Sequence, residues 1–439
     1  MNTKGLTVKL RAADLFCGAG GTSAGAHATG GVDVKFALNH WDRAIQTHSA
    51  NFPWTKHVNS RLENTSPSEA SDINLLFASP ECTHHSRARG GKPTSDQQRS
   101  GAWHVLPWIE HHRPSWVVIE NVVEFREWGP VNENGRPLQR FKGKFFDAWL
   151  MALRAAGYRL DVQELNAADF GAATSRNRLF VIARKGNRNP VFPEPTHGRH
   201  TTGALPGMGL LRWRAAADVI DWSIPCPSIF RRQRTLADKT LLRIEAGLRR
   251  FVGPYIFSTL SAGAPRPCEQ PTPTLTASGG CWLATPFQVQ FRNNLDAADI
   301  ESPVNTITAG GGHHGVATPY IVPNFGEADG QRPRTHSLDA PVPTIVTKDR
   351  HSLCVALCQG PQDWPAAESE AMRTLQATML KLGVCDVGFR MLSNPELAAA
   401  QGFHADYIFH GTKAEVTRQV GNSVSPAVAK AMTQAILSV

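Results

Sequence analysis

The chain has 439 residues, 41% of them hydrophobic, which is enough to fill the cores of two domains and excludes a disordered polymer. Lys and Arg number 46 against 37 Asp and Glu, and the resulting net charge of +9 suits a phosphate-rich partner without identifying one. Residues 1–11 lack the apolar core of a signal peptide, and no later segment offers the roughly 18 apolar residues of a membrane span, so we expect a soluble intracellular protein.

Eight cysteines are spread along the chain without a C-x-x-C pair and without a spaced quartet of Cys and His. Structural zinc sites depend on such spacing, so the sequence predicts no metal site. Free thiols in a reducing compartment are the expected state of these side chains.

The first part of the chain alternates β-like apolar runs with helical stretches as far as Arg184. Such alternation predicts repeated strand-helix units that build a parallel sheet, and we place this domain at residues 1–185. The expected strands are Ala12–Phe16, Val34–Leu38, Leu75–Ala78, Val117–Ile119 and Leu179–Ala183.

The first expected strand ends in the glycine-rich turn of Asp14–Gly21, and a helix is expected from about Ser23. A nucleotide-like ligand is expected at such a strand end, although a purely structural turn has the same appearance. The turn is not the dinucleotide fingerprint, because a G-x-G-x-x-G beginning at Gly18 requires glycine where the chain has Ser23.

Cys82 lies at the tip of the third expected strand, within Ala78–Ser86, and a basic, glycine-containing segment follows it. This position suits a nucleophile that attacks a ligand bound above the sheet. A lone cysteine is more often a small buried apolar residue, and His84 with His85 supplies too few ligands for a metal.

Glu120 ends the fourth expected strand, where burial favours the protonated carboxyl that general acid catalysis uses. Arg176 and Arg178 alternate just before the fifth strand and so share a face, which suits an anionic or carbonyl-rich ligand. Near the end of the chain, Arg418–Pro426 is expected to form a tight turn that opens a helix and packs beside the first glycine turn.

Between residues 186 and 385 the composition changes, with many Pro and Gly residues and short β-type runs, and this change predicts a second domain. Phrases beginning at Pro254, Pro286 and Pro319 lie 32 and 33 residues apart, and related phrases follow at 273–276, 305–308 and 343–346. Three related β units are expected, although coincidental hairpins are the alternative. Helices expected at Asn394–Gln401 and Pro426–Leu437 suggest that residues 386–439 return to the first domain.

In this order and at these separations the segments resemble the motif series of the DNA cytosine-5 methyltransferase family. The resemblance covers residues 11–184 and 386–437, and residues 186–385 fall where the family has its target recognition domain. It implies an α/β fold with a doubly wound, mostly parallel sheet of the S-adenosylmethionine-dependent methyltransferase type, joined to a second, β-rich target recognition domain.

The resemblance also implies roles for individual residues. Cys82 would be the nucleophile, Glu120 would contact the N3 edge of cytosine, and Arg178, with Arg176 beside it, would hold O2. The S-adenosylmethionine site would be formed by Asp14, Phe16, Gly18, Ala19, Gly20, Gly21, His40, Trp41, Pro80, Asn422, Ser423 and Val424.

Several positions depart from the family pattern, and we expect them to affect cofactor affinity and rate rather than reaction type. Glu81 and Thr83 replace the usual proline and glutamine on either side of the nucleophile, and His40 aligns with the acid that holds the ribose hydroxyls. Thr174 replaces a common glutamine, and no acid stands near Asn59–Ser60. Glu81 either raises the thiol pKa or, as we favour, faces a cation such as Arg87 or Arg89.

The resemblance implies double-stranded DNA as partner and a cytoplasmic, bacterial or phage-encoded monomer from a restriction-modification or phage-defence system. An RNA cytosine methyltransferase is the nearest alternative, and a catalytically silent DNA-binding relative is another. For target recognition we expect three turns in equivalent places of the β units to enter a groove, with solvated loop tips as the alternative. These turns are Ser278–Gly280, Gly310–His314 and Lys348–His351.

Overall fold

The computed structural model describes most of the chain and groups it into two compact units. The described residues are 9–81, 100–199, 209–252, 255–258, 266–267, 281–284, 288–290, 297–298, 314–323, 335–345, 347, 351–357 and 363–439. Unit 1 comprises Met1–Arg214, Pro343–Lys348 and Asn394–Val439, and unit 2 comprises Ala215–Val342 and Asp349–Ser393.

Unit 1 is built on a sheet whose described strands run in the order β3-β2-β1-β4-β5-β8-β6. From one edge to the other, these strands are Lys56–Asn59, Val32–Asn39, Leu10–Leu15, Leu75–Ala78, Trp116–Asn121, Asn177–Lys185 and Tyr158–Asn166. The first five are parallel, whereas β8 is antiparallel to both of its neighbours. All five strands expected from the sequence are confirmed, and so is the mostly parallel α/β class. The chain moves outward from β1 in both directions, so β1 and β4 form the switch point where such folds bind ligands.

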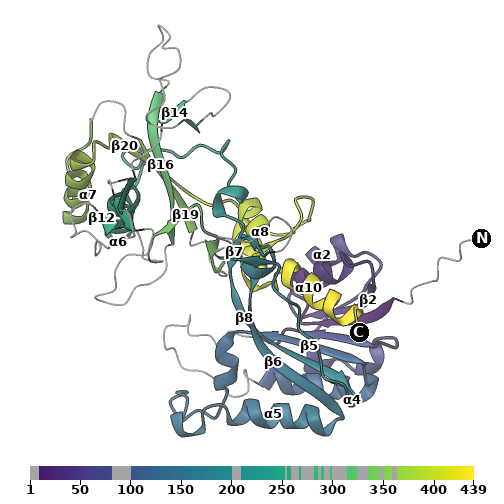
Figure 1. The fold of residues 1–439 in the computed structure, drawn as a ribbon. Coiled ribbons are helices and arrows are strands. Elements are labelled where there is room, and N and C mark those ends of the chain that lie inside the picture. The colour runs from purple at the N-terminus through teal and green to yellow at the C-terminus, as the bar shows by residue number, and fades with distance from the viewer. Residues whose placement is uncertain are drawn as a thin grey trace, which may run out of the picture. The chain divides into compact units, whose positions relative to one another are not determined.

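Helices cover both faces of this sheet (Figure 1). Apart from short 3-10 turns, the described helices of unit 1 are α1 (Gly21–His27), α2 (Asp42–Asn51), α4 (Leu106–His112), α5 (Lys144–Ala155), α8 (Asn394–Gln401), α9 (Lys413–Asn422) and α10 (Pro426–Leu437). Leu76 of β4 packs on the face with Trp108 and Trp149, whereas Phe77 packs on the face with Met432. This alternation of buried side chains is what a doubly wound sheet requires.

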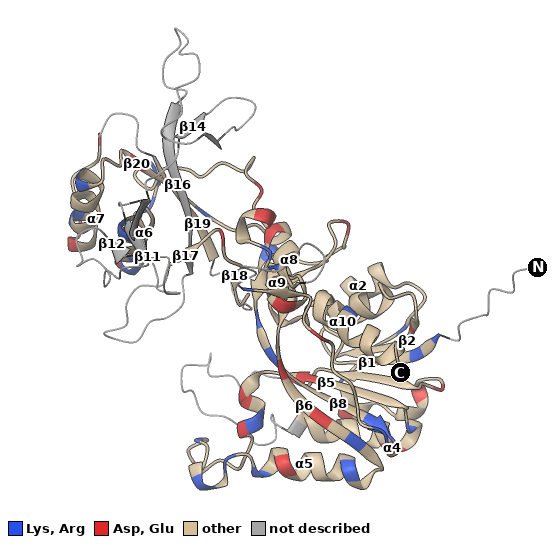
Figure 2. Cartoon of the chain, viewed as in Figure 1, with Lys and Arg blue, Asp and Glu red and all other residues tan. Residues whose placement is uncertain are grey.

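Unit 2 combines strands with two packed helices, α6 (Asp238–Phe251) and α7 (Glu370–Lys381). Apolar side chains at helical spacing on α6 pack with those of α7 in one buried cluster. Its larger sheet joins β15 (Ala297–Ala298), β14 (Gln288–Gln290), β16 (His314–Pro323), β19 (His351–Leu357) and β20 (Asp386–Met391), with β17 (His336–Ser337) beside β16. A smaller sheet joins β12 (Arg266–Pro267), β11 (Tyr255–Ser258) and β13 (Cys281–Ala284). Lys and Arg lie on elements of both units, including α6, α7, α5 and β8 (Figure 2).

The three repeated phrases coincide with β structure as far as the described residues show. Strand β11 begins at Tyr255, β14 begins at Gln288, and β16 contains Pro319. The related phrases at 273–276 and 305–308 lie outside the described residues. Three equivalent β units therefore stay a prediction.

The boundaries expected at 185/186 and 385/386 are displaced in the structure. Residues 186–214 belong to unit 1, because β9 (His197–Gly198) pairs with β10 (Leu211–Arg212) and Trp213 donates from Nε1 to Asp169 at 2.9 Å. Residues 386–393 belong to unit 2, because β20 pairs with β19 over its whole length. Pairing between distant segments, rather than the local texture of the sequence, decides both boundaries.

Two local expectations are wrong. Arg418–Asn422 is not a turn but the end of α9, which begins with a capping box between Thr412 and Glu415, a signal readable in the sequence. His351 is not a loop tip, because it begins β19 with only 1% of its surface exposed, and burial lowers its pKa to about 4. Arg350 and the turns at 278–280 and 310–313 lie outside the described residues.

Candidate active site

The residues expected to form the site follow strands whose carboxyl ends meet at one edge of the sheet. Phe16 follows β1, His40 follows β2, Pro80 follows β4, and Glu120 lies one residue before the end of β5. Because these strands are parallel and adjacent, their ends lie side by side. The structure therefore brings both groups of residues, those expected to bind the cofactor and those expected to contact the base, to the same edge.

The glycine-rich turn is shaped by left-handed backbone and by close packing. Phe16 has φ 59°, a region that non-glycine residues adopt at a cost, and Gly20 has φ 88°. A Cβ added to Gly20 would lie 2.6 Å from Oη of Tyr407, and one added to Gly21 would lie 2.1 Å from the carbonyl oxygen of Val424. Side chains are therefore excluded from this turn by the C-terminal part of the chain.

The C-terminal segment expected beside this turn is held there by hydrogen bonds. Ser423 is buried, and its carbonyl accepts a 2.8 Å bond from Nε2 of Gln401. Tyr407 donates from its hydroxyl to the carbonyl of Ala19. Asn422 is exposed at the end of α9. The segment after α9 therefore packs beside the glycine turn, although it is not the long turn expected, and no local motif points to Gln401 or Tyr407.

A buried chain of hydrogen bonds begins at Asp14 of β1. Ser23 donates to Asp14 Oδ2 at 2.7 Å, His48 Nε2 lies 3.0 Å from the same hydroxyl, and His48 Nδ1 lies 2.8 Å from His57 Nε2. Because Ser23 uses its proton on Asp14, neutral His48 donates from Nε2 and accepts at Nδ1. Burial raises the pKa of Asp14 to about 7 and lowers that of His48 to about 3. Within the described residues Asp14 Oδ1 has no hydrogen-bond partner.

His40 and Trp41 follow β2, and each lies close to an ionisable side chain from another part of the chain. His40 Nδ1 lies 3.6 Å from Oε1 of Glu81. The expected contact of Glu81 with Arg87 or Arg89 stays a prediction, because both arginines lie outside the described residues. The guanidinium of Arg418 lies 4.6 Å from the centre of the Trp41 ring, close enough for a cation-π contact.

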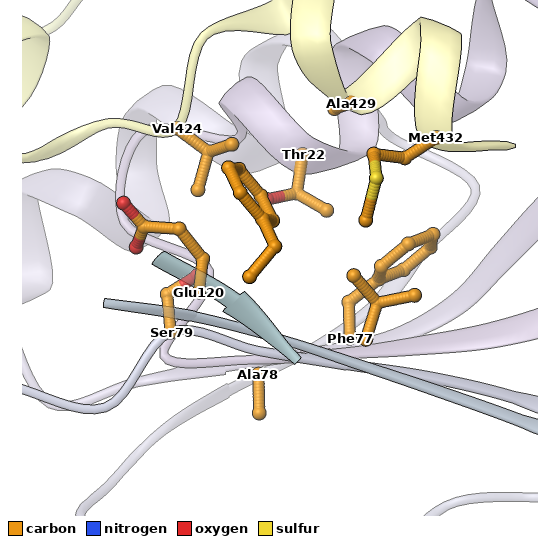
Figure 3. Close-up of a pocket in the computed structure, with 10 residues that line it drawn as sticks. Thr22, Phe77, Ala78, Ser79, Glu120, Val424, Ala429 and Met432 are labelled. Atoms are coloured by element: carbon orange, nitrogen blue, oxygen red, sulfur yellow. The ribbon is translucent and has the colours of Figure 1, made fainter. Parts of the chain in front are cut away.

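Glu120 forms an ion pair inside an apolar pocket. Its Oε1 lies 3.2 Å from Nε of Arg178. The pocket is lined by Thr22, Phe77, Ala78, Ser79, Val118, Phe180, Val424, Ala429 and Met432. Burial raises the pKa of Glu120, and the charges of Arg178 and Arg176 oppose that rise. Figure 3 shows its carboxylate pointing away from Phe77 and Met432, so the polar end is directed out of the apolar part of the pocket.

Arg176 is anchored by a segment far away in the chain. Its side chain is buried, and one guanidinium nitrogen donates at 3.1 Å to the carbonyl of Ile345, 169 residues away. Thr344 donates at 3.1 Å to the carbonyl of Ser175 in β7 (Thr174–Ser175), next to Pro343 of β18 (Val342–Pro343). Both arginines oppose the rise in the pKa of Glu120, and their contact with one ligand stays a prediction.

Cys82 lies outside the described residues, as do Thr83 and the rest of the segment 82–99. The chain leading to it is fixed by Asn121, whose Nδ2 donates to the carbonyl of Pro80 at 3.1 Å. The Oδ1 of Asn121 accepts from the N–H of Val122 at 2.8 Å. Asn121 is the last residue of β5, and its role in joining the ends of β4 and β5 depends on the tertiary structure.

Together these groups fit a nucleoside cofactor that carries a cationic amino-acid tail, as S-adenosylmethionine does. The turn leaves room for backbone to approach a ligand, and the buried Asp14 Oδ1 has acceptor capacity that a cation or donor could use. Two aromatic side chains, Phe16 and Trp41, follow the strand ends where an adenine ring could pack. The Glu120–Arg178 pair next to this region combines a carboxyl group and a guanidinium, which are suitable partners for a second, planar ligand.

Comparison with known proteins agrees with this arrangement. The sequence model of the C-5 cytosine-specific DNA methylase family matches residues 10–205 and 327–438. The chain is 25% identical to mouse DNA (cytosine-5)-methyltransferase 1 over 97% of its own length, but it spans only 28% of that protein. It is 27% identical to the Type II methyltransferase M.AquIA of Picosynechococcus over 42% of the chain and 75% of that protein.

A solved structure of another methyltransferase has a similar fold. The Dnmt2 methyltransferase of S. pombe superposes with a TM-score of 0.52 at 14% identity, and the match covers 98% of each chain. A likeness at this identity concerns the fold alone. In the part of the chain that the structure describes, no helix has the length and apolar character needed to cross a bilayer.

Proposed function

The chain belongs to the C-5 cytosine-specific DNA methylase family, and from this premise we propose that it transfers a methyl group from S-adenosylmethionine to carbon 5 of cytosine in DNA. The Glu120–Arg178 pair carries the most weight, because it holds a buried carboxyl and a guanidinium at the edge where the glycine turn lies. A carboxyl with a raised pKa can give a proton to N3 of a cytosine, and Arg178 can donate to O2.

Cys82 is the proposed nucleophile. Its thiolate adds to carbon 6 of cytosine while Glu120 places a proton on or near N3, so the ring becomes an enamine that is nucleophilic at carbon 5. After transfer of the methyl group, loss of the carbon-5 proton and of the Cys82 thiolate restores the aromatic ring. Arg176, fixed to the carbonyl of Ile345, is proposed to keep the base side of the site in shape.

Residues on the other half of the edge are proposed to hold the cofactor. When bound, S-adenosylmethionine supplies an electrophilic methyl group on a sulfonium centre. The proposed contacts come from Asp14, Phe16, Gly18, Ala19, Gly20, Gly21, His40, Trp41, Pro80, Asn422, Ser423 and Val424. Asp14 is a suitable acceptor for the cationic part of this ligand, because its buried Oδ1 lacks a partner among the described residues.

Double-stranded DNA is the proposed substrate, and the target cytosine must leave the stack to reach a pocket at a sheet edge, at a cost of a few kcal/mol. Residues 186–385, which contain most of unit 2, are proposed to read the target sequence, within a cytoplasmic restriction-modification or phage-defence enzyme that acts as a monomer. The Type II methyltransferases among its relatives support the restriction-modification part of this proposal.

Transfer of tritium from labelled S-adenosylmethionine to duplex DNA or to tRNA, measured side by side, tests the proposed activity. We expect label in DNA, at cytosines that bisulfite sequencing then locates. Label in tRNA alone would establish the RNA alternative, and no label in either would leave the silent DNA-binding alternative.

The nucleophile is tested by covalent trapping on DNA that carries 5-fluorocytosine at the target, since fluorine blocks the final elimination. The wild-type protein should form an adduct that survives denaturing electrophoresis, and Cys82→Ala should form none and lose methyl transfer altogether. Cys385→Ala, a substitution in unit 2, is the matched control and should trap normally. An adduct that persists in Cys82→Ala would assign the nucleophile to another residue.

A further inference from the structure

The side chains of His40 and Glu81 reach toward each other across the end of the central strand β1. His40 directly follows β2 and Glu81 lies three residues beyond β4, and these strands flank β1 on either side. Their side chains are 3.6 Å apart, His40 Nδ1 to Glu81 Oε1. The pair therefore stands beside the glycine turn that follows β1, where the proposed cofactor would bind.

In nucleotide-binding α/β folds, an acid near the end of the second strand accepts hydrogen bonds from the ribose hydroxyls. Here that position carries an imidazole, His40. The next carboxylate along the chain, Asp42, accepts at 2.7 Å from Gln46 within α2 and at 3.3 Å from Asn59 of β3. Both oxygens of Asp42 thus already accept a hydrogen bond, one within its own helix and one from β3.

Glu81 brings a carboxylate to this place from the other flanking strand. Its side chain is 40% exposed, so the two oxygens keep acceptor capacity beyond the contact with His40. The separation of 3.6 Å exceeds a hydrogen bond, and exposed pairs of this kind add little to stability. Since folding gains little from the pair, ligand binding is the better explanation for a carboxylate held here.

We propose that Glu81 accepts hydrogen bonds from the ribose hydroxyls of S-adenosylmethionine and that His40 is a positioning residue that keeps this carboxylate over the turn. The inference rests on the proposed function, because it assigns a residue of the same cofactor site. It also links the cofactor to the reaction, since Glu81 is joined by a peptide bond to Cys82.

Calorimetric titration with S-adenosylhomocysteine, which has the same nucleoside, and with its 2′,3′-dideoxy analogue tests the contact without requiring turnover. Loss of the hydroxyls should weaken binding to the wild-type protein about 10- to 100-fold, the usual effect of a hydrogen bond to a charged group. Glu81→Ala, which removes both acceptor oxygens, should weaken binding of S-adenosylhomocysteine by a similar factor and should then bind the two ligands almost equally.

Two further variants locate the contact. Asp42→Asn, the matched control, should keep the wild-type dependence on the hydroxyls. His40→Gln should bind both ligands more weakly but keep that dependence, because the Glu81 carboxylate is still present.

The proposal is overturned if the effects of Glu81→Ala and of hydroxyl loss simply multiply, or if Asp42→Asn or His40→Gln abolishes the dependence while Glu81→Ala retains it. A wild-type protein that binds neither ligand would refute the proposed cofactor itself, and this inference with it. Binding without coupling to Glu81 would refute this inference alone.

Discussion

The proposed site has a base half at the ends of β5 and β8 and a cofactor half at the ends of β1, β2 and β4. The two halves are built in different ways. Around β5 and β8, a buried carboxyl is held by an arginine from the neighbouring strand, and a second arginine is anchored to a distant carbonyl. Around β1, β2 and β4, the side chains of His40 and Glu81 lie close together and are partly exposed, and both positions depart from the family pattern. Proton transfer requires a group at one defined place, whereas a ribose hydroxyl needs only an acceptor within reach.

Two buried acids show the same contrast. Burial raises the pKa of both Asp14 and Glu120. Two guanidinium charges oppose the rise at Glu120, but at Asp14 the opposing groups are the hydroxyl and the backbone N–H of Ser23. The arrangement at Glu120 suits a proton donor that loses and regains its proton in each turnover. The arrangement at Asp14 suits an acid that stays neutral or that ionises when a cationic ligand binds.

The largest effect is expected at Glu120. Glu120→Gln keeps the shape of the side chain but cannot donate a carboxyl proton, so the rate of methyl transfer should fall about 10²- to 10⁴-fold. Binding of S-adenosylhomocysteine should be unchanged if the two halves are independent. Glu164→Gln, which alters an exposed acid on β6, is the control and should keep full activity. A Glu120→Gln variant with normal turnover would remove the acid from the reaction.

A smaller but clear effect is expected where the C-terminal segment meets the glycine turn. In Gly21→Ala the new methyl group would lie 2.1 Å from the carbonyl of Val424, so the backbone must shift, and we expect a loss of about 1–3 kcal/mol in the free energy of unfolding. Gly101→Ala is the control, because its Cβ would meet Pro80 at an ordinary 3.9 Å. Equal urea midpoints for the two variants would show that the packing at Gly21 is loose.

A third effect is a change in pH dependence at Asp14. Its pKa is raised by burial from 3.8 to about 7, so the folded state holds the proton more tightly and stability from this group is lost as the pH rises through that range. Relative to wild type, Asp14→Asn should therefore become progressively more stable between pH 4 and pH 7. The measurement is the free energy of urea unfolding of both proteins at each pH.

Glu415 is the control, because the pH dependence of its contribution to stability should have the opposite sign. A hydrogen bond from the backbone N–H of Thr412 lowers the pKa of Glu415, so its contribution is present at neutral pH and is lost as the pH falls through the folded pKa. Glu415→Gln should therefore approach wild type on acidification. Parallel curves for wild type and Asp14→Asn would mean that Asp14 ionises as an exposed acid does.

Much of unit 1 follows from local patterns. Apolar runs bounded by turn residues predict its five central strands, and Asn394–Gln401 and Pro426–Leu437 form helices with the predicted bounds. The order of the motifs also identifies Glu120 and Arg178, which the structure places 3.2 Å apart. These features depend on neighbours in the chain, so periodicity and spacing are sufficient to find them.

Other features depend on contacts that no local pattern encodes. Glu81 lies beside His40 from another strand end, Arg176 is held by the carbonyl of Ile345, and Asp14 is connected through Ser23 to two histidines. The antiparallel direction of β8 and the assignment of β20 to unit 2 are of the same kind. A strand's direction, and the partner of a charged side chain, are decided by which distant segments pack beside it. That choice is made by burial and hydrogen bonding in the folded chain, and only the tertiary structure reveals it.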